Sequence, residues 1–208
     1  MAFKELIANR LKRIVRKAVL FFSLRNRNRK AVEIVDWLRL HSVKDVLLVG
    51  TAGEELTSNS EMVNVGIIER RIADTFDIKM GINIYPAKTS YPFIIANACD
   101  MPFEDNYVDF ALANAIIEHV GDQVDQLKMV QEMTRVARAW VIATPNKWFP
   151  IESHTSVVFL HWLPSWRRKH KQDFTRLLSR RDFRRLLPPG ATLVGEPWSP
   201  TFTAYYAR

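Results

Sequence analysis

The chain has 208 residues, of which 48% are hydrophobic and 25% are charged, which suits one folded domain of ordinary size and excludes a disordered tail. No apolar run approaches the ~20 residues that a membrane-spanning helix requires. Cys99 is the single cysteine, which excludes an internal disulfide and a cysteine-rich zinc site, so we expect a cytoplasmic protein without a metal centre.

The net charge of +8 is concentrated in two parts of the chain. Residues 1–30 contain ten Lys or Arg and one acidic residue. Residues 167–185 contain nine Lys or Arg and two acidic residues. This pattern favours a positive surface for an anionic partner, such as a membrane, an anionic substrate or, less favoured, a nucleic acid. Two solvated surface helices would give the same pattern.

The N-terminal part is predicted to be helical. Residues 3–24 carry a stripe of apolar side chains at intervals of three and four: Phe3, Ile7, Leu11, Ile14, Val15, Ala18 and Phe22. The other positions are rich in Lys and Arg, so this helix can lie on an anionic membrane or pack on the following domain. We interpret Asn26–Lys30 as a polar break before a helix over Ala31–Leu40. The predicted division is a basic helical segment, residues 1–40, and a main domain, residues 41–208.

From Val43 onward, strand and helix patterns alternate. Apolar runs predict strands at Val46–Val49, Ile78–Ile84, Tyr91–Ala96, Tyr107–Ala115, Trp140–Ala143, Thr192–Gly195 and Thr201–Ala207. Helical spacing predicts helices over Glu61–Thr75, Asp122–Ala139 and Gln172–Leu187. This alternation predicts an α/β fold with a mostly parallel sheet and helices on both faces.

Ligands of such sheets bind beyond the carboxyl ends of the strands, so the loop after the first strand is a candidate site. It reads Val49-Gly50-Thr51-Ala52-Gly53, and Gly50 permits close approach of the backbone because it has no Cβ. The loop is neither a dinucleotide-binding G-x-G-x-x-G nor a P-loop. An ordinary strand-to-helix turn is the alternative interpretation.

The stretch 97–119 carries the most distinctive pattern, N-A-C-D-M-P-F-E-D-N-Y-V-D-F followed by E-H-V. It resembles the signature D-A-x-x-L-P-F-x-D-x-x-F-D-x-V and E-H-V of class I S-adenosylmethionine (SAM) dependent methyltransferases. Two further blocks, T-P-N-x-W-F-P-I-E-x-H from Thr144 and H-W-L-P from His161, resemble a bacterial branch of that family, of the methyltransferase type 11 kind. The resemblance covers roughly residues 44–166. It implies the Rossmann-like fold with a seven-stranded sheet, and SAM as the cofactor.

The resemblance also implies contacts with the cofactor in the loop after the first strand. Gly50, Thr51 and Gly53 fall within the glycine-rich loop of the family. Leu48 and Ala52 replace an acid and a glycine of the family pattern. The acid helps to hold the methionine amino group in the family, and Glu54 or Glu55 is a conceivable substitute.

Three asparagines fall at further cofactor positions of the family. Asn83 stands where an acid binds both ribose hydroxyls, and its amide can donate and accept. Asn97 stands at an adenine-facing acid, and the amide of Ala98 would face the ring edge. Asn114 lies at the end of the fourth strand, where the methyl group is expected. A capping role at a strand end is the alternative for Asn83, and Asp109 is interpreted as structural.

His119, His154 and His161 are candidate general bases, because an imidazole can take a proton from an attacking hydroxyl near neutral pH. The alternative interpretation of each is a hydrogen-bonded residue that anchors its loop. The aromatic residues around them, Trp148, Phe149, Trp162 and Trp166, suit the walls of a substrate pocket.

The leading hypothesis is a SAM-dependent methyltransferase acting on a hydroxyl of a small molecule, a glycan or a lipid-linked sugar. Such a role in polysaccharide biosynthesis would place it in the cytoplasm, at the inner face of the membrane. The alternatives are a non-catalytic binding module on the same scaffold and an RNA-directed methyltransferase. The sequence does not determine the oligomeric state.

Overall fold

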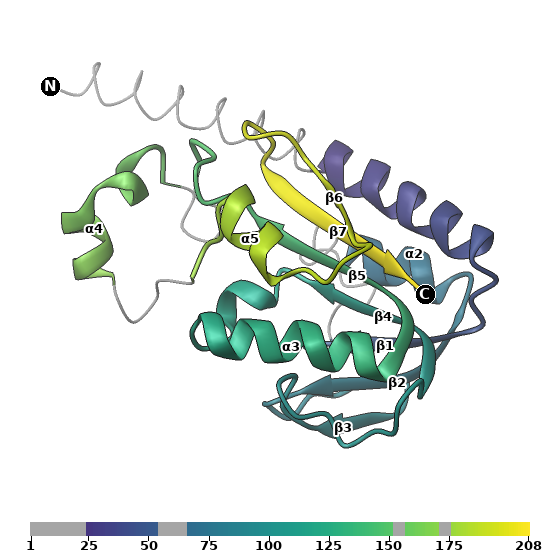
Figure 1. Cartoon of the computed structure of the whole chain (residues 1–208). Helices are drawn as coiled ribbons and strands as arrows, with labels where there is room; N and C mark the ends of the chain where they lie inside the picture. Colours follow the sequence, from purple (N-terminus) through teal and green to yellow (C-terminus); the bar gives the residue numbers. More distant parts are fainter. Residues whose placement is uncertain (1–23, 54–65, 152–156, 171–175) are drawn as a thin grey trace, which may run out of the picture.

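The computed structural model describes residues 24–53, 66–151, 157–170 and 176–208. Seven strands form one sheet in the order β3-β2-β1-β4-β5-β7-β6 (Figure 1). Their bounds are β1 Asp45–Val49, β2 Asp77–Asn83, β3 Phe93–Ile95, β4 Val108–Asn114, β5 Ala137–Pro145, β6 Thr192–Val194 and β7 Thr201–Ala207. The first five strands are parallel, and β7 runs antiparallel to both β5 and β6. The predicted fold class is therefore confirmed.

Helices cover both faces of the sheet (Figure 1). They are residues 24–40, α2 Ile67–Ala73, η3 Ile117–His119, α3 Gln123–Val136, η4 Leu160–Trp162, α4 Pro164–Lys169 and α5 Arg180–Leu186. One apolar core lies between the sheet, α3 and α5, and a second lies between the sheet, helix 24–40 and α2. Strand side chains alternate between these cores: Leu47 and Val49 face the first, and Leu48 faces the second. Burial on both faces explains why the strands read as continuous apolar runs.

The break predicted at Asn26–Lys30 is wrong, because residues 24–40 are helical throughout. The Asn28 side chain donates to the carbonyl of Leu24, and Arg29 pairs with Glu33 one turn later. Polar residues that face solvent do not interrupt a helix whose other face is buried. Residues 1–23 lie outside the described part, and the domain division at residue 40 stays a prediction.

The helix predicted over Gln172–Leu187 begins later than expected. Residues 171–175 are outside the described part, residues 176–179 are not helical, and α5 begins at Arg180. Ser179 sets this start, because its hydroxyl accepts from the backbone N–H of Asp182. Asp122 caps α3 in the same way, as predicted, and these backbone donors lower the pKa of Asp122. Among the described residues, no helix is long and apolar enough to cross a membrane.

Candidate active site

The carboxyl ends of β1, β2, β3 and β4 gather most of the predicted site residues along one edge of the sheet. The loop after β1 is fixed to the neighbouring strand, since the N–H groups of Gly50 and Thr51 both donate to the carbonyl of Ile82, at 2.8 and 3.2 Å. The Thr51 hydroxyl also lies 2.5 Å from the hydroxyl of Tyr91. This loop is therefore held in place by β2 and by the segment that leads into β3.

Two glycines of this loop have backbone angles that favour glycine, with φ of +79° at Gly50 and +83° at Gly53. A Cβ on Gly53 would collide with the carbonyl oxygen of Lys88, and one on Gly50 would collide with the side chain of Ile116. The space beside Gly50 thus accommodates a side chain of the protein itself. The sequence analysis considered a ligand or an ordinary strand-to-helix turn there, but not the side chain of Ile116.

Asn83 lies at the end of β2 and joins two loops. Its amide nitrogen donates to the carbonyl of Thr51 at 2.9 Å, and its oxygen accepts from the N–H of Tyr85 at 3.3 Å. An amide has two donors and two acceptor lone pairs, so one of each remains for a ligand such as a ribose hydroxyl. A carboxylate at position 83 could accept from the N–H of Tyr85 but could not donate to the carbonyl of Thr51.

Asn97 and Ala98 begin the loop after β3. The Asn97 side chain accepts from the N–H of Cys99 at 2.9 Å, which fixes the turn that presents Ala98. Partial burial and the nearby Asp125 carboxylate raise the pKa of the Cys99 thiol, which argues against a reactive thiolate.

The same loop is tied to α3 by Glu132 and Arg135. The Glu132 carboxylate accepts from the N–H of Met101 at 2.7 Å and from Arg135, and the Arg135 guanidinium donates to the carbonyls of Met101 and Phe103. Hydrogen bonding from the guanidinium lowers the pKa of Glu132. A carboxylate and a guanidinium therefore define the shape of the loop that is expected to face the adenine.

A buried carboxylate lies beside the end of β4. The Asn114 amide donates to Oε1 of Glu69 at 2.9 Å, and Glu69 on α2 is only 8% exposed. Sequence analysis missed Glu69: an acid between the buried positions Ile68 and Ile72 of a helix indicates burial, but it does not indicate the contact with Asn114. A second buried carboxylate, Glu118, accepts from the Thr144 hydroxyl at 3.0 Å.

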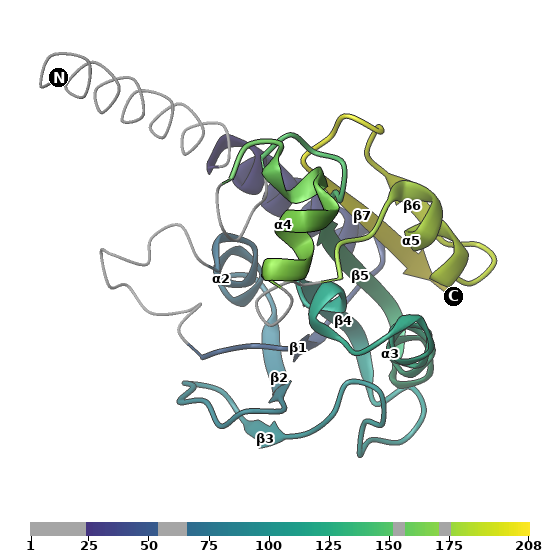
Figure 2. The same cartoon turned by 90° about the vertical axis from the view of Figure 1, so that its left-hand side faces the viewer.

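The three candidate histidines have different surroundings. His119 is exposed at the end of η3. His161 in η4 is 3% exposed, and neither ring nitrogen has a hydrogen-bond partner among the described residues. His154 lies outside the described residues. Figures 1 and 2 together place α4, which follows η4, beyond the carboxyl ends of β4 and β5. Among the described residues, no cluster of potential metal ligands is present.

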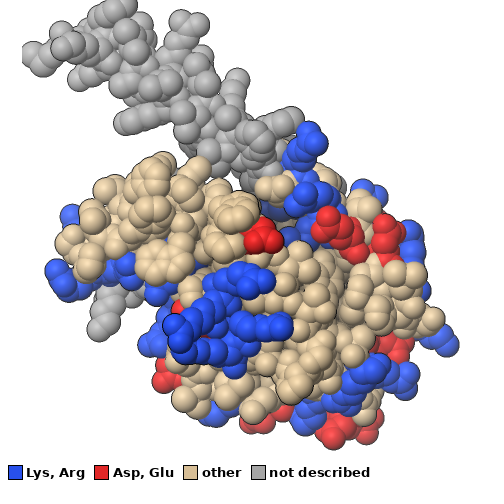
Figure 3. All heavy atoms as spheres, turned by 45° about the horizontal axis from the view of Figure 1, so that its top comes forward, with Lys and Arg blue, Asp and Glu red and all other residues tan. Residues whose placement is uncertain are grey.

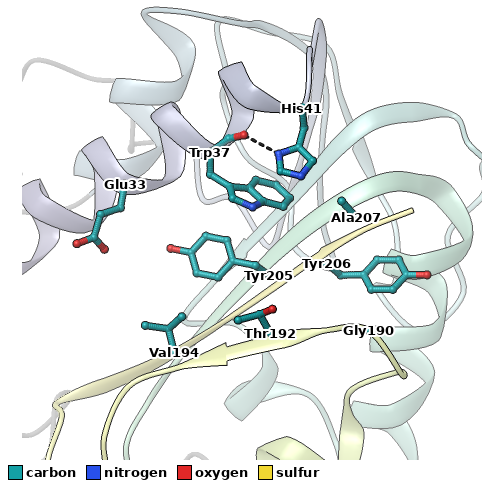
Figure 4. A pocket seen from close by; sticks show the side chains of 9 residues that line it. All are labelled: Glu33, Trp37, His41, Gly190, Thr192, Val194, Tyr205, Tyr206 and Ala207. Atoms are coloured by element: carbon teal, nitrogen blue, oxygen red, sulfur yellow. Dashed lines mark hydrogen bonds between the residues drawn. The ribbon is translucent and has the colours of Figure 1, made fainter.

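A hollow of about 470 Å³ lies elsewhere, between helix 24–40 and the β6–β7 hairpin (Figure 4). Trp37 and Tyr205 form its aromatic wall, with ring centroids 5.5 Å apart. Burial and the Glu33 carboxylate raise the pKa of Tyr205 to about 12. Ala207 at its far end pairs with Ala139 near the start of β5, so the hollow is toward the amino ends of the parallel strands and away from the predicted site.

Comparison with known proteins agrees with this fold. Residues 75–140 match the family model described as a methyltransferase domain. A search of curated proteins gave no match. The chain has a class I methyltransferase fold. Together, the matched domain and the fold support S-adenosylmethionine as the cofactor.

Solved structures with this fold resemble the chain at low sequence identity. They include the N-methyltransferase NodS from Bradyrhizobium japonicum, with 11% identity, a TM-score of 0.55, and coverage of 88% of this chain and 94% of that chain. A protein from Pyrococcus horikoshii has 11% identity, a TM-score of 0.54, and coverage of 86% and 88%. A SAM-dependent methyltransferase from Methanosarcina mazei has 12% identity, a TM-score of 0.50, and coverage of 78% and 91%. These likenesses concern the fold and leave the methyl acceptor open.

Proposed function

We propose that this protein transfers the methyl group of SAM to a hydroxyl group of a small molecule, a glycan or a lipid-linked sugar. The observation that carries the proposal is the row of Thr51, Asn83, Ala98 and Asn114 along the carboxyl edge of the sheet, with the Glu69 carboxylate beside it. When bound, SAM supplies a methyl group on a positively charged sulfonium.

In this proposal the loops after the first four strands hold the cofactor. The Asn83 amide retains a donor and an acceptor for the ribose hydroxyls, and the turn fixed by Asn97 presents the backbone N–H of Ala98 to the adenine edge. Gly50, Thr51 and Gly53 supply backbone groups of the loop after β1. The observed hydrogen bonds hold these groups in place before a ligand arrives, which reduces the cost of ordering them on binding.

In this proposal Glu69 supplies negative charge at the carboxyl edge of the sheet, where Leu48 supplies none. Leu48 is 1% exposed and packs in the core beneath helix 24–40, so its side chain does not reach the site. Glu69 instead brings a carboxylate to Asn114, at the strand end where the methyl group is expected. A carboxylate in a poorly solvated position attracts a nearby positive charge more strongly than one in water.

We assign proton removal from the acceptor hydroxyl to His161 ahead of His119. The ring nitrogens of His161 are buried and make no hydrogen bond within the described part of the chain, so one of them can accept a proton from a substrate hydroxyl. His119 is exposed, where water competes for the same proton. His154 remains a further candidate from the sequence.

The test is methyl transfer from radiolabelled SAM by the full chain to hydroxyl acceptors of three classes: free sugars, polysaccharide and lipid-linked sugars. The proposal expects label in at least one class and none when the acceptor is omitted. Label that enters only RNA, or only amine acceptors, would contradict it.

Two observations favour a second candidate, a binding module without catalysis. Ile116 fills the space beside Gly50, and amides replace carboxylates at Asn83 and Asn97. Such a module would bind SAM or its demethylated product equally well and would transfer no label. A catalyst would instead transfer the label to an acceptor, so methyl transfer from radiolabelled SAM separates the two candidates.

A further inference from the structure

The segment beyond the ends of β4 and β5, here called the cap, consists of residues 146–151 and 157–169. Five of its large apolar residues expose about half of their surface to solvent: Trp148 50%, Val158 47%, Phe159 51%, Leu160 48% and Leu163 51%. Single exposed apolar residues are ordinary on protein surfaces, but a cluster of this size marks an interaction site.

The backbone of the cap brings these side chains together. Ile151 and Val158 form a β-bridge, and the N–H of Phe159 donates to the carbonyl of Pro150 at 2.8 Å. This contact places Phe159 close to the turn that carries Trp148. Phe159 has a φ of +59°, an unfavourable conformation for a bulky residue, so the fold imposes the exposed position of this ring at an energetic cost.

Positive charge surrounds this apolar cluster. Among the described residues of the cap, Lys147, Arg167, Arg168 and Lys169 are the charged side chains, and none is an acid. The neighbouring α5 adds four exposed arginines, Arg180, Arg181, Arg184 and Arg185, against one acid, Asp182. Figure 3 shows Lys and Arg gathered along the edge of the projecting part of the molecule, beside a broad uncharged surface.

We propose that the cap binds an anionic lipid surface, with Phe159, Leu160 and their neighbours inserted among the lipids and the cations of α4 and α5 on the headgroups. Apolar side chains flanked by cations are the features that hold proteins at anionic membrane interfaces. A nucleic acid would match the cations, but Val158, Leu160 and Leu163 offer it neither hydrogen bonds nor stacking.

This inference does not depend on methyl transfer. If the proposed function also holds, the cap would bring the carboxyl edge of the sheet close to the bilayer, where a lipid-linked acceptor is located.

The test is flotation of the full chain with vesicles of phosphatidylcholine alone or mixed with phosphatidylglycerol. We expect binding to the mixed vesicles, weakened by salt. The double variant Phe159→Ser/Leu160→Ser should bind at least tenfold less tightly, and Arg168→Gln/Lys169→Gln about fivefold less for each charge removed. The control for the apolar variant is Trp198→Ser, because Trp198 is 74% exposed and lies outside the cap. The control for the charge variant is Arg39→Gln/Lys128→Gln, which removes two exposed cations elsewhere. Both controls should bind the vesicles as tightly as the parent chain.

Three results would overturn the proposal: no binding to the mixed vesicles, equal binding to neutral vesicles, or binding that the apolar cap variant leaves unchanged. If light scattering shows a dimer of the parent chain that the apolar cap variant does not form, and neither chain binds vesicles, the cap is instead a protein interface. Circular dichroism confirms that each variant is folded. Trp148→Ser alone replaces the double variant if the latter does not fold.

Discussion

Asn83 shows how a departure from a sequence pattern can be part of a consistent local structure. Its amide nitrogen faces the carbonyl of Thr51, so Asn83→Asp would place two acceptors against each other. We expect this change to lower the free energy of unfolding by about 1–3 kcal/mol, measured by urea denaturation. Asn97→Asp is the matched control and should change it by less than about 0.5 kcal/mol, because Asn97 is an acceptor toward Cys99. Equal stability of the two variants would contradict this explanation of Asn83.

Glu69 is the residue whose role is best tested by charge alone. Glu69→Gln keeps the acceptor for Asn114 but removes the negative charge. The affinity for SAM should fall about tenfold, and that for the neutral S-adenosylhomocysteine by less than twofold, because only SAM carries the sulfonium charge. Calorimetric titration with both ligands measures the ratio, and a parallel loss for both would remove the electrostatic role.

Substitution of His161 can distinguish a role as the general base from a role in stabilising the fold. The ring nitrogens of His161 make no hydrogen bond with any described residue, so His161→Phe should change the free energy of unfolding by less than about 1 kcal/mol. Turnover should fall by about 10²–10⁴-fold with the affinity for SAM unchanged. Steady-state kinetics together with denaturation tests both, and unchanged turnover would exclude His161 as the base.

The positions of Asn83, Asn97 and Asn114 at strand ends were predictable, because each follows an apolar run. Glu69 and Ile116 were not, since their roles depend on contacts between elements distant in sequence. Periodicity reveals which face of a helix is buried, but not which carboxylate that face brings to a neighbouring strand.

At the scale of elements, the Glu132–Arg135 pair connects α3 to the loop after β3. The lowered pKa of Glu132 means that its carboxylate stabilises the fold above the ordinary glutamate pKa near 4.3 and that this contribution is lost as the pH falls through the lower folded value. Glu132→Gln should therefore reduce stability at neutral pH and flatten its decline below about pH 4.5. Thermal denaturation of the parent chain and of Glu132→Gln between pH 3 and pH 7 measures both effects. Parallel stability profiles of the two proteins would contradict the stabilising role of the Glu132 carboxylate.

Element boundaries were predictable where a cap was visible in the sequence. Asp122 fixed the start of α3, and the apolar runs located all seven strands. The polar run Asn26–Lys30 was misread as a break because it lies on the solvent side of a helix held by Ala31, Ile34 and Leu38. The start of α5 was missed because the basic stretch before Ser179 has no clear period.

At the scale of the molecule, one edge of the sheet concentrates the polar groups and the cap, while the opposite end holds the Trp37–Tyr205 hollow. Parallel strands produce this asymmetry, because every loop after a parallel strand emerges at the same edge. The alternation of strand and helix patterns was therefore sufficient to predict which loops would meet there, but not every residue that the helices bring to them. The same alternation could not identify the methyl acceptor, because acceptor binding depends on side chains that are not fixed by the periodicity of strands and helices.

The most direct test of the account is calorimetric titration of the purified full chain with SAM, after mass spectrometry of the protein for nucleoside carried through purification. We predict one site per chain with a dissociation constant in the micromolar range, and weaker binding for Asn83→Ala, which loses the ribose contacts. Absence of heat, of a thermal shift and of any co-purified nucleoside at millimolar SAM would contradict the claim that the carboxyl edge of this sheet holds the cofactor.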